Sequence, residues 1–161
     1  MFWSALIAAV ARILLVVLFP FSALDKIFDW KGALKQAESS FLPGGPILLI
    51  AAALVEFVAP FCVVFAWHDR LAALLLALFC VVTALLYHEF WKFGDFWRRG
   101  ASKGRADFWD FLKNLGLAGG LLLVVFGSPA ASLGGFLSHP LSSSHVYAGA
   151  TPTIAKPTSG G

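Results

Sequence analysis

The stretch LAALLLALFCVVTALLY, residues 71–87, contains no charged residue and no proline, and it decides the class of protein. A helix rises about 1.5 Å per residue, so this stretch and its continuation to Trp91 span about 30 Å, the thickness of a bilayer's hydrocarbon core. Backbone groups in lipid must be paired within the spanning structure, and a long apolar run without alternation indicates a helix. Residues 71–91 therefore predict a transmembrane helix.

Three further apolar runs have the same character. They cover residues 3–24, 47–67 and 109–127, with Arg12 inside the first and Glu56 inside the second. Of the 161 residues, 59% are hydrophobic and 13% are charged, whereas a soluble domain is about half apolar and a quarter charged. The sequence predicts an all-α integral membrane protein, a bundle of four transmembrane helices.

The segments outside these runs predict the rest of the organisation. The bundle occupies residues 1–138 as one domain, and residues 139–161 form a tail rich in Ser, Thr, Pro and Gly that we expect to be flexible unless a partner orders it. The loop at 25–40 mixes apolar and charged residues and favours an interfacial helix. The loop between the last two runs, rich in Phe, Trp and Arg, is expected to lie on the anionic leaflet.

The basic residues predict the orientation of the chain. The two long loops hold most of them: Lys26, Lys31, Lys35, Lys92, Arg98, Arg99, Lys103 and Arg105. The opposite side carries only Arg70, in a tight turn, and Lys156, in the tail. Because positively charged loops stay in the cytoplasm, we expect both long loops inside and both termini in the periplasm. The same pattern predicts that these cations bind membrane lipids and that the protein binds no nucleic acid.

Two ionisable residues are predicted near the middle of the membrane. Arg12 lies nine residues after Trp3 and Glu56 lies nine residues after Ile47, so each is about 14 Å from the edge of its span. A charge at this depth is costly unless it is paired, and we predict that Arg12 and Glu56 form an ion pair. The pair either locks the first helix against the second or handles protons or a ligand.

A second polar cluster is predicted at the cytoplasmic end of the third and fourth spans. It consists of Tyr87, His88 and Glu89, with Asn114 at a similar level. His88 could donate a hydrogen bond to a quinone carbonyl, or it could bond to Asn114 and staple the two helices together. In the fourth span, Gly116 and Gly120 are one turn apart, which lets another helix approach closely.

Motifs for intrinsic chemistry are absent from the sequence. There is no G-x-S-x-G, phosphate-binding loop or H-E-x-x-H, and only His88 lies deep enough to ligate a haem in the membrane. Cys62 and Cys80 have no metal-site spacing. We therefore predict no catalytic residue, no metal and no resident cofactor, with a quinone or a lipid as the candidate bound molecule.

Four short motifs, in order on the four predicted helices, resemble the DoxX family of small bacterial membrane proteins. They are Arg12-Ile-Leu-Leu with Phe21-Ser-Ala-Leu-Asp25-Lys26, then Leu54-Val-Glu56, then Tyr87-His88-Glu89-Phe90-Trp91, then Phe111-Leu-Lys-Asn114-Leu with Gly119-Gly120. The resemblance covers residues 10–134 and implies a four-helix bundle in the bacterial inner membrane. The polar positions shared with the family are Arg12, Glu56, His88 and Asn114.

The resemblance also implies a class of function. Some members of the family are membrane subunits of a thiosulfate:quinone oxidoreductase, and others are similar to partners of redox proteins. We expect a non-catalytic accessory subunit of a membrane-bound respiratory or quinone-linked oxidoreductase, with other membrane subunits as partners. The alternatives are a subunit with its own quinone site near His88 and, ranked last, a small proton or solute transporter acting through Arg12 and Glu56.

Overall fold

The computed structural model describes residues 2–39, 45–127 and 133–147, and every regular element in these ranges is helical. The elements are α1 (Phe2–Val16), α2 (Leu18–Phe28), α3 (Trp30–Glu38), α4 (Gly45–Val64), α5 (Asp69–Tyr87), the 3-10 helix η1 (Phe90–Lys92), α6 (Lys103–Phe126) and α7 (Leu133–Ser138).

Four helical segments of the described chain are long and apolar enough to cross a membrane. They are Trp3–Phe28, which joins α1 and α2, then Gly45–Val64, Asp69–Lys92 and Lys103–Phe126. The prediction of an all-α bundle with four membrane-spanning helices is confirmed.

The first spanning segment is longer than predicted and has a break in it. The helix continues past Leu24 to Phe28, so Lys26 lies inside the helical span and not in a loop. Val17 alone separates α1 from α2. Pro20, three residues later, has no N–H to donate to the carbonyl of Val16, which removes one rung of the hydrogen-bond ladder at this point.

The fourth spanning segment begins earlier than the predicted residue 109. Ser102 caps the helix, because its hydroxyl accepts a hydrogen bond from the amide N–H of Arg105 at 3.2 Å. A serine at this position satisfies an amide that has no partner within the helix, so the helix starts at Lys103. The apolar pattern begins only later, which is why hydropathy alone placed the start six residues further on.

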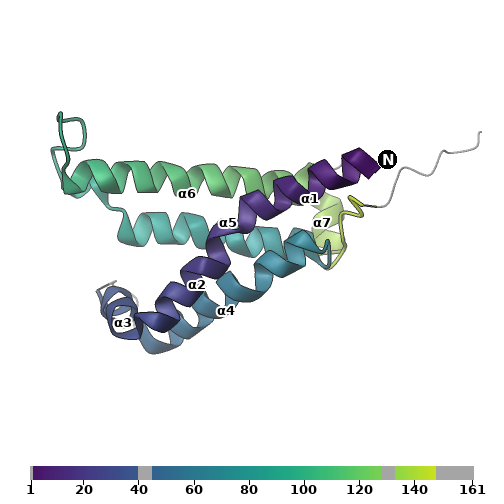
Figure 1. Ribbon diagram of the computed structural model, residues 1–161, viewed down its shortest axis with the longest axis horizontal. Helices are drawn as coiled ribbons and strands as arrows, with labels where there is room; N and C mark the ends of the chain where they lie inside the picture. The colour runs from purple at the N-terminus through teal and green to yellow at the C-terminus, as the bar shows by residue number, and fades with distance from the viewer. Residues whose placement is uncertain (1, 40–44, 128–132, 148–161) are drawn as a thin grey trace, which may run out of the picture.

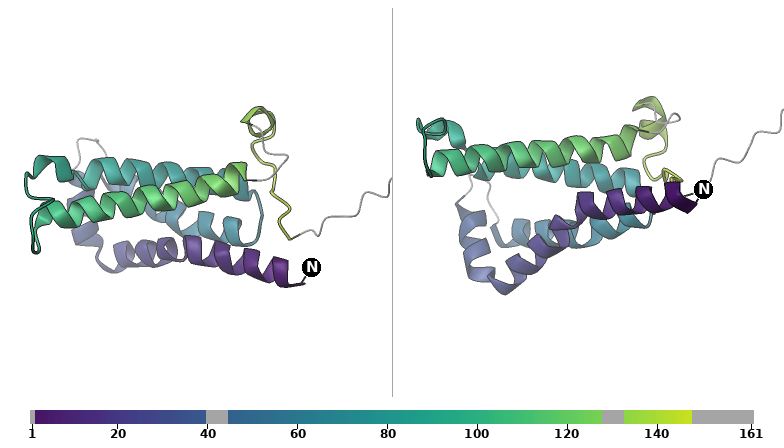
Figure 2. Two further views of the ribbon diagram at one scale, coloured as in Figure 1. Left: turned by 90° about the horizontal axis from the view of Figure 1, so that it is seen from above. Right: turned by 45° about the horizontal axis from the view of Figure 1, so that its top comes forward.

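The helices are arranged as a bundle that is open at one end. The core consists mostly of apolar side chains from α4, α5 and α6, among them the fully buried Val63, Leu76 and Leu121, with additions from α1, α2 and α7. Figure 1 shows α5 and α6 lying side by side, with α2 and α4 diverging from them toward α3. We call the end with α3 and η1 the loop end, and the opposite end, with residues 65–68 and 133–147, the terminal end; the views in Figure 2 show both.

The helix favoured by the loop at 25–40 is present as α3, which closes part of the loop end. Asp29 caps it, since the Asp29 carboxylate accepts a hydrogen bond from the N–H of Gly32 at 3.1 Å. At its other end, Glu38 lies against Gly45, where an added Cβ would come within 2.8 Å of the Glu38 Cγ. The absence of a side chain at Gly45 therefore lets α3 pack tightly on the start of α4.

The segment after residue 138, expected to be flexible, is bound to the bundle as far as it is described. After α7, residues 141–147 run across the terminal end and form hydrogen bonds to α1, the turn at 65–68 and α5. The flexibility of the tail stays a prediction, but serine hydroxyls in this part bind the buried charges of Arg12, Asp69 and Arg70. Residues 148–161 lie outside the described part of the chain.

Candidate functional site

A large pocket lies at the loop end, between the diverging helices. Its volume is about 820 Å³, within the range of about 300–1,000 Å³ typical of ligand sites. Its walls come from α2, α3, α4, α5 and α6. Most lining side chains are aliphatic, and the polar ones include four groups used below: Lys26, Glu56, His88 and Asn114.

The deepest polar group of the pocket is an ion pair between α2 and α4. Nζ of Lys26 lies 2.7 Å from Oε2 and 3.0 Å from Oε1 of Glu56, and Glu56 is 2% exposed. Ser22, one turn before Lys26, accepts a hydrogen bond from Nζ at 2.7 Å and donates one to Oε1 at 3.0 Å. The ammonium, hydroxyl and carboxylate thus form a closed triad in the pocket wall.

This triad corrects the predicted pair between Arg12 and Glu56. The structure gives each residue a different partner, because Lys26 is helical and within reach of Glu56, whereas Arg12 lies toward the terminal end. Glu56 is eleven residues into α4, about 16 Å from Gly45, so its predicted depth near the middle of the span is retained. Pro60 lacks the N–H that would bind the Glu56 carbonyl, so α4 also has a broken rung at this level.

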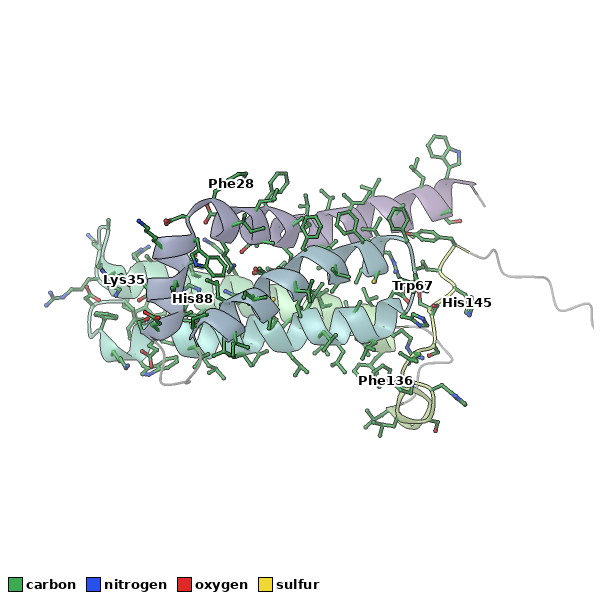
Figure 3. The ribbon with its side chains drawn as sticks, turned by 90° about the horizontal axis from the view of Figure 1, so that it is seen from below. Phe28, Lys35, Trp67, His88, Phe136 and His145 are labelled. Carbon is green, nitrogen blue, oxygen red and sulfur yellow. The ribbon has the colours of Figure 1, made fainter. Side chains whose placement is uncertain are left out.

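His88 and Asn114 belong to the pocket, but they do not staple α5 to α6 as one prediction proposed. Nδ2 of Asn114 donates to the backbone carbonyl of Asp110 in its own helix, at 3.0 Å. Nδ1 of His88 is buried and lies 3.9 Å from the Asp107 carboxylate, too far for a hydrogen bond. Within the described chain Nδ1 has no hydrogen-bond partner, which leaves it as a buried polar atom without one. Figure 3 shows His88 at the end that also carries Lys35.

The remaining residues singled out from the sequence separate into two groups. Tyr87 lines the pocket, next to His88, but Glu89 does not and instead pairs with Lys92 at 2.5 Å. Gly120 faces α1, and a Cβ there would lie 2.8 Å from Cδ1 of Leu15, so its small size serves helix packing. A Cβ added at Gly116 would meet no atom of another element within 4 Å, so close helix packing does not require a glycine there.

Arg12 takes part in a second polar cluster, at the terminal end. Its Nη1 lies 2.7 Å from Oδ2 of Asp69 and donates to the carbonyl of Val63 at 2.6 Å. Its Nη2 donates to the hydroxyl of Ser144 at 2.8 Å. Ser144 in turn binds both carboxylate oxygens of Asp69, through its hydroxyl at 2.5 Å and its backbone N–H at 2.9 Å. Asp69 is completely buried, so this cluster shuts out solvent.

Arg70 extends the same cluster toward α6 and α7. Its Nε donates to the carbonyl of Val125 at 2.9 Å and its Nη1 to the hydroxyl of Ser142 at 3.0 Å. The guanidinium carbon lies 5.3 Å from the ring centre of Phe136 in α7, a cation–π contact. We call Arg12, Asp69, Arg70, Ser142 and Ser144 the terminal network. Trp67 and Phe136, labelled in Figure 3, mark this end.

Sequence reasoning missed three residues that complete these two clusters. Lys26 was assigned to a loop because the apolar run stops at Leu24, although the spacing Ser22–Lys26 is one helical turn and signals that the helix continues. Asp69 was treated as part of a surface turn. Ser144 lies in a tail with no apolar period, and nothing in the sequence indicates that it reaches a buried carboxylate.

The described residues contain no group of three or more His, Cys, Asp or Glu side chains that could hold a metal ion. Cys62 and Cys80 are free thiols. What the pocket offers is therefore a set of hydrogen-bonding groups at the end of an apolar chamber. This arrangement suits an amphipathic molecule with a polar head and a hydrocarbon part.

Comparison with known proteins agrees with the fold. The model of the DoxX family matches residues 7–89, which include most of α1 and all of α2, α3, α4 and α5. The chain is 31% identical over 122 residues to inner membrane protein YqjF of Escherichia coli K12, an alignment covering 76% of this chain and 84% of YqjF. It is 27% identical over 123 residues to inner membrane protein YphA of the same organism, covering 76% and 83% of the two chains. No solved structure matches.

The four apolar spans and the largely apolar chamber between them define a small multi-pass membrane protein. Since the family model covers more than half of the chain, the protein belongs to the DoxX family. The resemblance found in the sequence motifs is confirmed.

Proposed function

We propose that this DoxX-family protein is a non-catalytic membrane subunit that holds a quinone for a membrane-bound oxidoreductase. The observation that carries the proposal is the pocket of about 820 Å³, in which aliphatic walls end in the triad of Lys26, Glu56 and Ser22. A quinone has the matching chemistry, with an apolar ring and tail and two carbonyl oxygens that accept hydrogen bonds.

The charges around the pocket favour a neutral head group. Its charged lining residues are three carboxylates, of Asp25, Asp29 and Glu56, and one ammonium, of Lys26, which already pairs with Glu56. An anionic phospholipid head would meet a surplus of negative charge there. A quinone or quinol is uncharged and forms only hydrogen bonds with its head group, so the carboxylates do not repel it.

Two sets of polar groups could bind the two oxygens of such a head. Lys26 and Ser22 carry donors on α2, and the Glu56 carboxylate can accept from a quinol hydroxyl. His88 offers its unpartnered Nδ1 from α5, with Asn114 nearby on α6. The bundle has two arms, one formed by α2 and α4 and one formed by α5 and α6. A bound quinone would then connect the two arms.

We further propose an assignment of the two ends to the two sides of the inner membrane. The loop end carries most cations of the described chain, among them Lys31, Lys35, Arg98 and Arg99, whereas the terminal end carries Arg12 and Arg70, both buried in the terminal network. Because positively charged loops remain in the cytoplasm, the pocket would lie on the cytoplasmic side and the terminal network on the periplasmic side.

Quinone binding can be tested with the purified protein in nanodiscs, by equilibrium titration with decylubiquinone. Loss of a hydrogen bond to a charged group removes about 1.5–3 kcal/mol, so Glu56→Gln should weaken binding by about tenfold or more. Glu89→Gln is the matched control, since Glu89 lies outside the pocket, and it should leave affinity unchanged. Absence of saturable binding by the wild-type protein would overturn the quinone proposal.

The subunit role needs a separate test. The protein, extracted gently from its native membrane, should migrate together with a stoichiometric redox partner in native electrophoresis, and mass spectrometry would identify that partner. Replacing His88 by Ala should reduce quinone-dependent turnover of the complex and leave the complex assembled. If the wild-type protein migrates alone, the role of an accessory subunit is wrong.

A further inference from the structure

The lining of the pocket differs from place to place in how far it is exposed. The polar lining residues Ser22, Lys26, Glu56, His88 and Asn114 are buried or half-buried. Where α4 and α5 diverge, the exposed lining residues are aliphatic: Leu48 and Ala51 of α4 and Leu75, Leu78 and Val82 of α5. These five side chains are exposed; Leu78, for example, is 53% exposed. Aliphatic side chains exposed on a spanning helix are suited to hydrocarbon, not to water.

Part of the pocket's side toward the loops is covered by α3. This helix contributes Gly32, Ala33 and Gln36 to the lining, and its ends are held by the Asp29 cap and by the close packing of Glu38 on Gly45. A ligand arriving from the aqueous side would have to pass α3. A ligand dissolved in the bilayer would first meet the exposed aliphatic side chains of α4 and α5.

We propose that the pocket takes its ligand sideways from the bilayer, through an opening between α4 and α5, and that the ligand is a quinone with a long polyprenyl tail. This inference rests on the proposed function. The head reaches the triad of Lys26, Glu56 and Ser22, and the tail lies between Ala51 and Leu78 and continues into the lipid. A long tail does not fit inside a chamber of about 820 Å³ together with the head, so it requires an exit of this kind.

The opening can be tested by filling it. Leu78→Trp adds bulk at the rim between α4 and α5. Leu18→Trp makes the same change on α2, at the other side of the pocket, where Leu18 is 57% exposed. Leu123→Trp is the control on α6, because Leu123 is 72% exposed and does not line the pocket. Each variant is titrated in nanodiscs with a ubiquinone carrying a long polyprenyl tail and with one carrying a single isoprene unit.

We expect Leu78→Trp to weaken binding of the long-tailed quinone by about tenfold or more and to leave the short-tailed quinone within about twofold. Leu18→Trp and Leu123→Trp should preserve the preference shown by the wild-type protein. A second rim variant, Ala51→Trp, should reproduce the selective loss if Leu78→Trp proves unstable.

Three results would overturn the lateral opening. They are unchanged binding of the long-tailed quinone in both rim variants, equal loss of both quinones in those variants, and selective loss in Leu18→Trp instead. Failure of the wild-type protein to bind either quinone would contradict the proposed function itself, so the two hypotheses fail by different observations.

Discussion

At the terminal end, Arg12, Asp69 and Arg70 are buried and covered by residues 141–147, whereas at the loop end Lys26 and Glu56 face a pocket of about 820 Å³. Both ends hold charge inside a spanning helix bundle, and Glu56 is as buried as the terminal network, but the side chain of its partner Lys26 is 23% exposed, whereas the side chains of Arg12 and Asp69 are 8% and 0% exposed. Enclosed charges contribute to stability only when each one is fully paired, because the protein excludes the water that would otherwise solvate them. Charges beside an open chamber remain available to a ligand. The comparison therefore favours a stabilising role for the terminal network and agrees with the binding role proposed for the loop end.

The largest expected effect is the loss of Asp69. Asp69→Ala leaves the guanidinium of Arg12 buried without its carboxylate, which should destabilise the fold by about 3–5 kcal/mol. Reversible unfolding in detergent measures the change. Asp110→Ala removes an exposed carboxylate paired only with Lys113 and should stay within about 0.5 kcal/mol. Similar losses in the two variants would contradict the role given to the terminal network.

Replacing Ser144 should have the next largest effect. Ser144→Ala removes a hydroxyl that accepts from Arg12 and donates to Asp69, both of them charged and buried. Hydrogen bonds to charged groups contribute about 1.5–3 kcal/mol, and unfolding in detergent should show a loss of that size. Ser138→Ala, which removes only a bond to the carbonyl of Gly134, is the control. An unchanged stability of Ser144→Ala would mean that the segment after residue 138 does not hold the terminal end closed.

A smaller effect is expected from Tyr147→Phe. The phenol donates to the carbonyl of Val64 at 2.7 Å, while the ring lies beside Arg12, its centre 5.8 Å from the guanidinium carbon. Phenylalanine keeps the ring and loses the hydrogen bond, so about 1 kcal/mol should be lost. Hydrogen exchange should become faster in the turn at residues 65–68 and remain unchanged around α3. Faster exchange at both ends would show that the two ends are not independent.

Replacing the ion pair at the loop end is expected to have the smallest effect on stability and the largest effect on ligand binding. In the double variant Lys26→Met/Glu56→Leu, apolar side chains replace the ion pair, an exchange that is often neutral or stabilising. Unfolding should stay within about 1 kcal/mol of wild type, and titration in nanodiscs should show no decylubiquinone binding. Arg12→Met/Asp69→Leu should lower stability and leave decylubiquinone binding unchanged. Stability falls because Val63 and Ser144 lose their hydrogen bonds to this pair. Stability lost equally in the two double variants would remove the distinction between the ends.

The fold could be predicted from the sequence because hydropathy alone determines it. An uninterrupted apolar run such as residues 71–87 has no stable place except in lipid, and only a helix pairs its backbone there. The same reasoning predicted the level of Glu56 in its span and the membership of His88 and Asn114 in a polar region at one end. These features depend on position along a helix, which the rise per residue gives directly.

The partners of the charges could not be predicted in the same way. They depend on how each helix is rotated and where it ends, and the helix that carries Lys26 continues beyond its apolar run because Lys26 has an internal partner. The terminal network depends further on Ser142 and Ser144, which reach it through a segment without periodic pattern. Equal depth made Arg12 and Glu56 a plausible pair. The structure instead places Asp69 beside Arg12 and Lys26 beside Glu56.

Pro20 and Pro60 interrupt the hydrogen-bond ladders of the two helices that form one arm of the bundle, and each lies between the terminal network and the triad in the chain. Such interruptions make a helix easier to bend at one place than along its length. If the chamber binds a ligand as proposed, we expect the arm made of α2 and α4 to bend at these two points, while the residues that anchor α1 and the turn at 65–68 stay in place. The two imino acids would then confine the mechanical response to a ligand to half of the molecule.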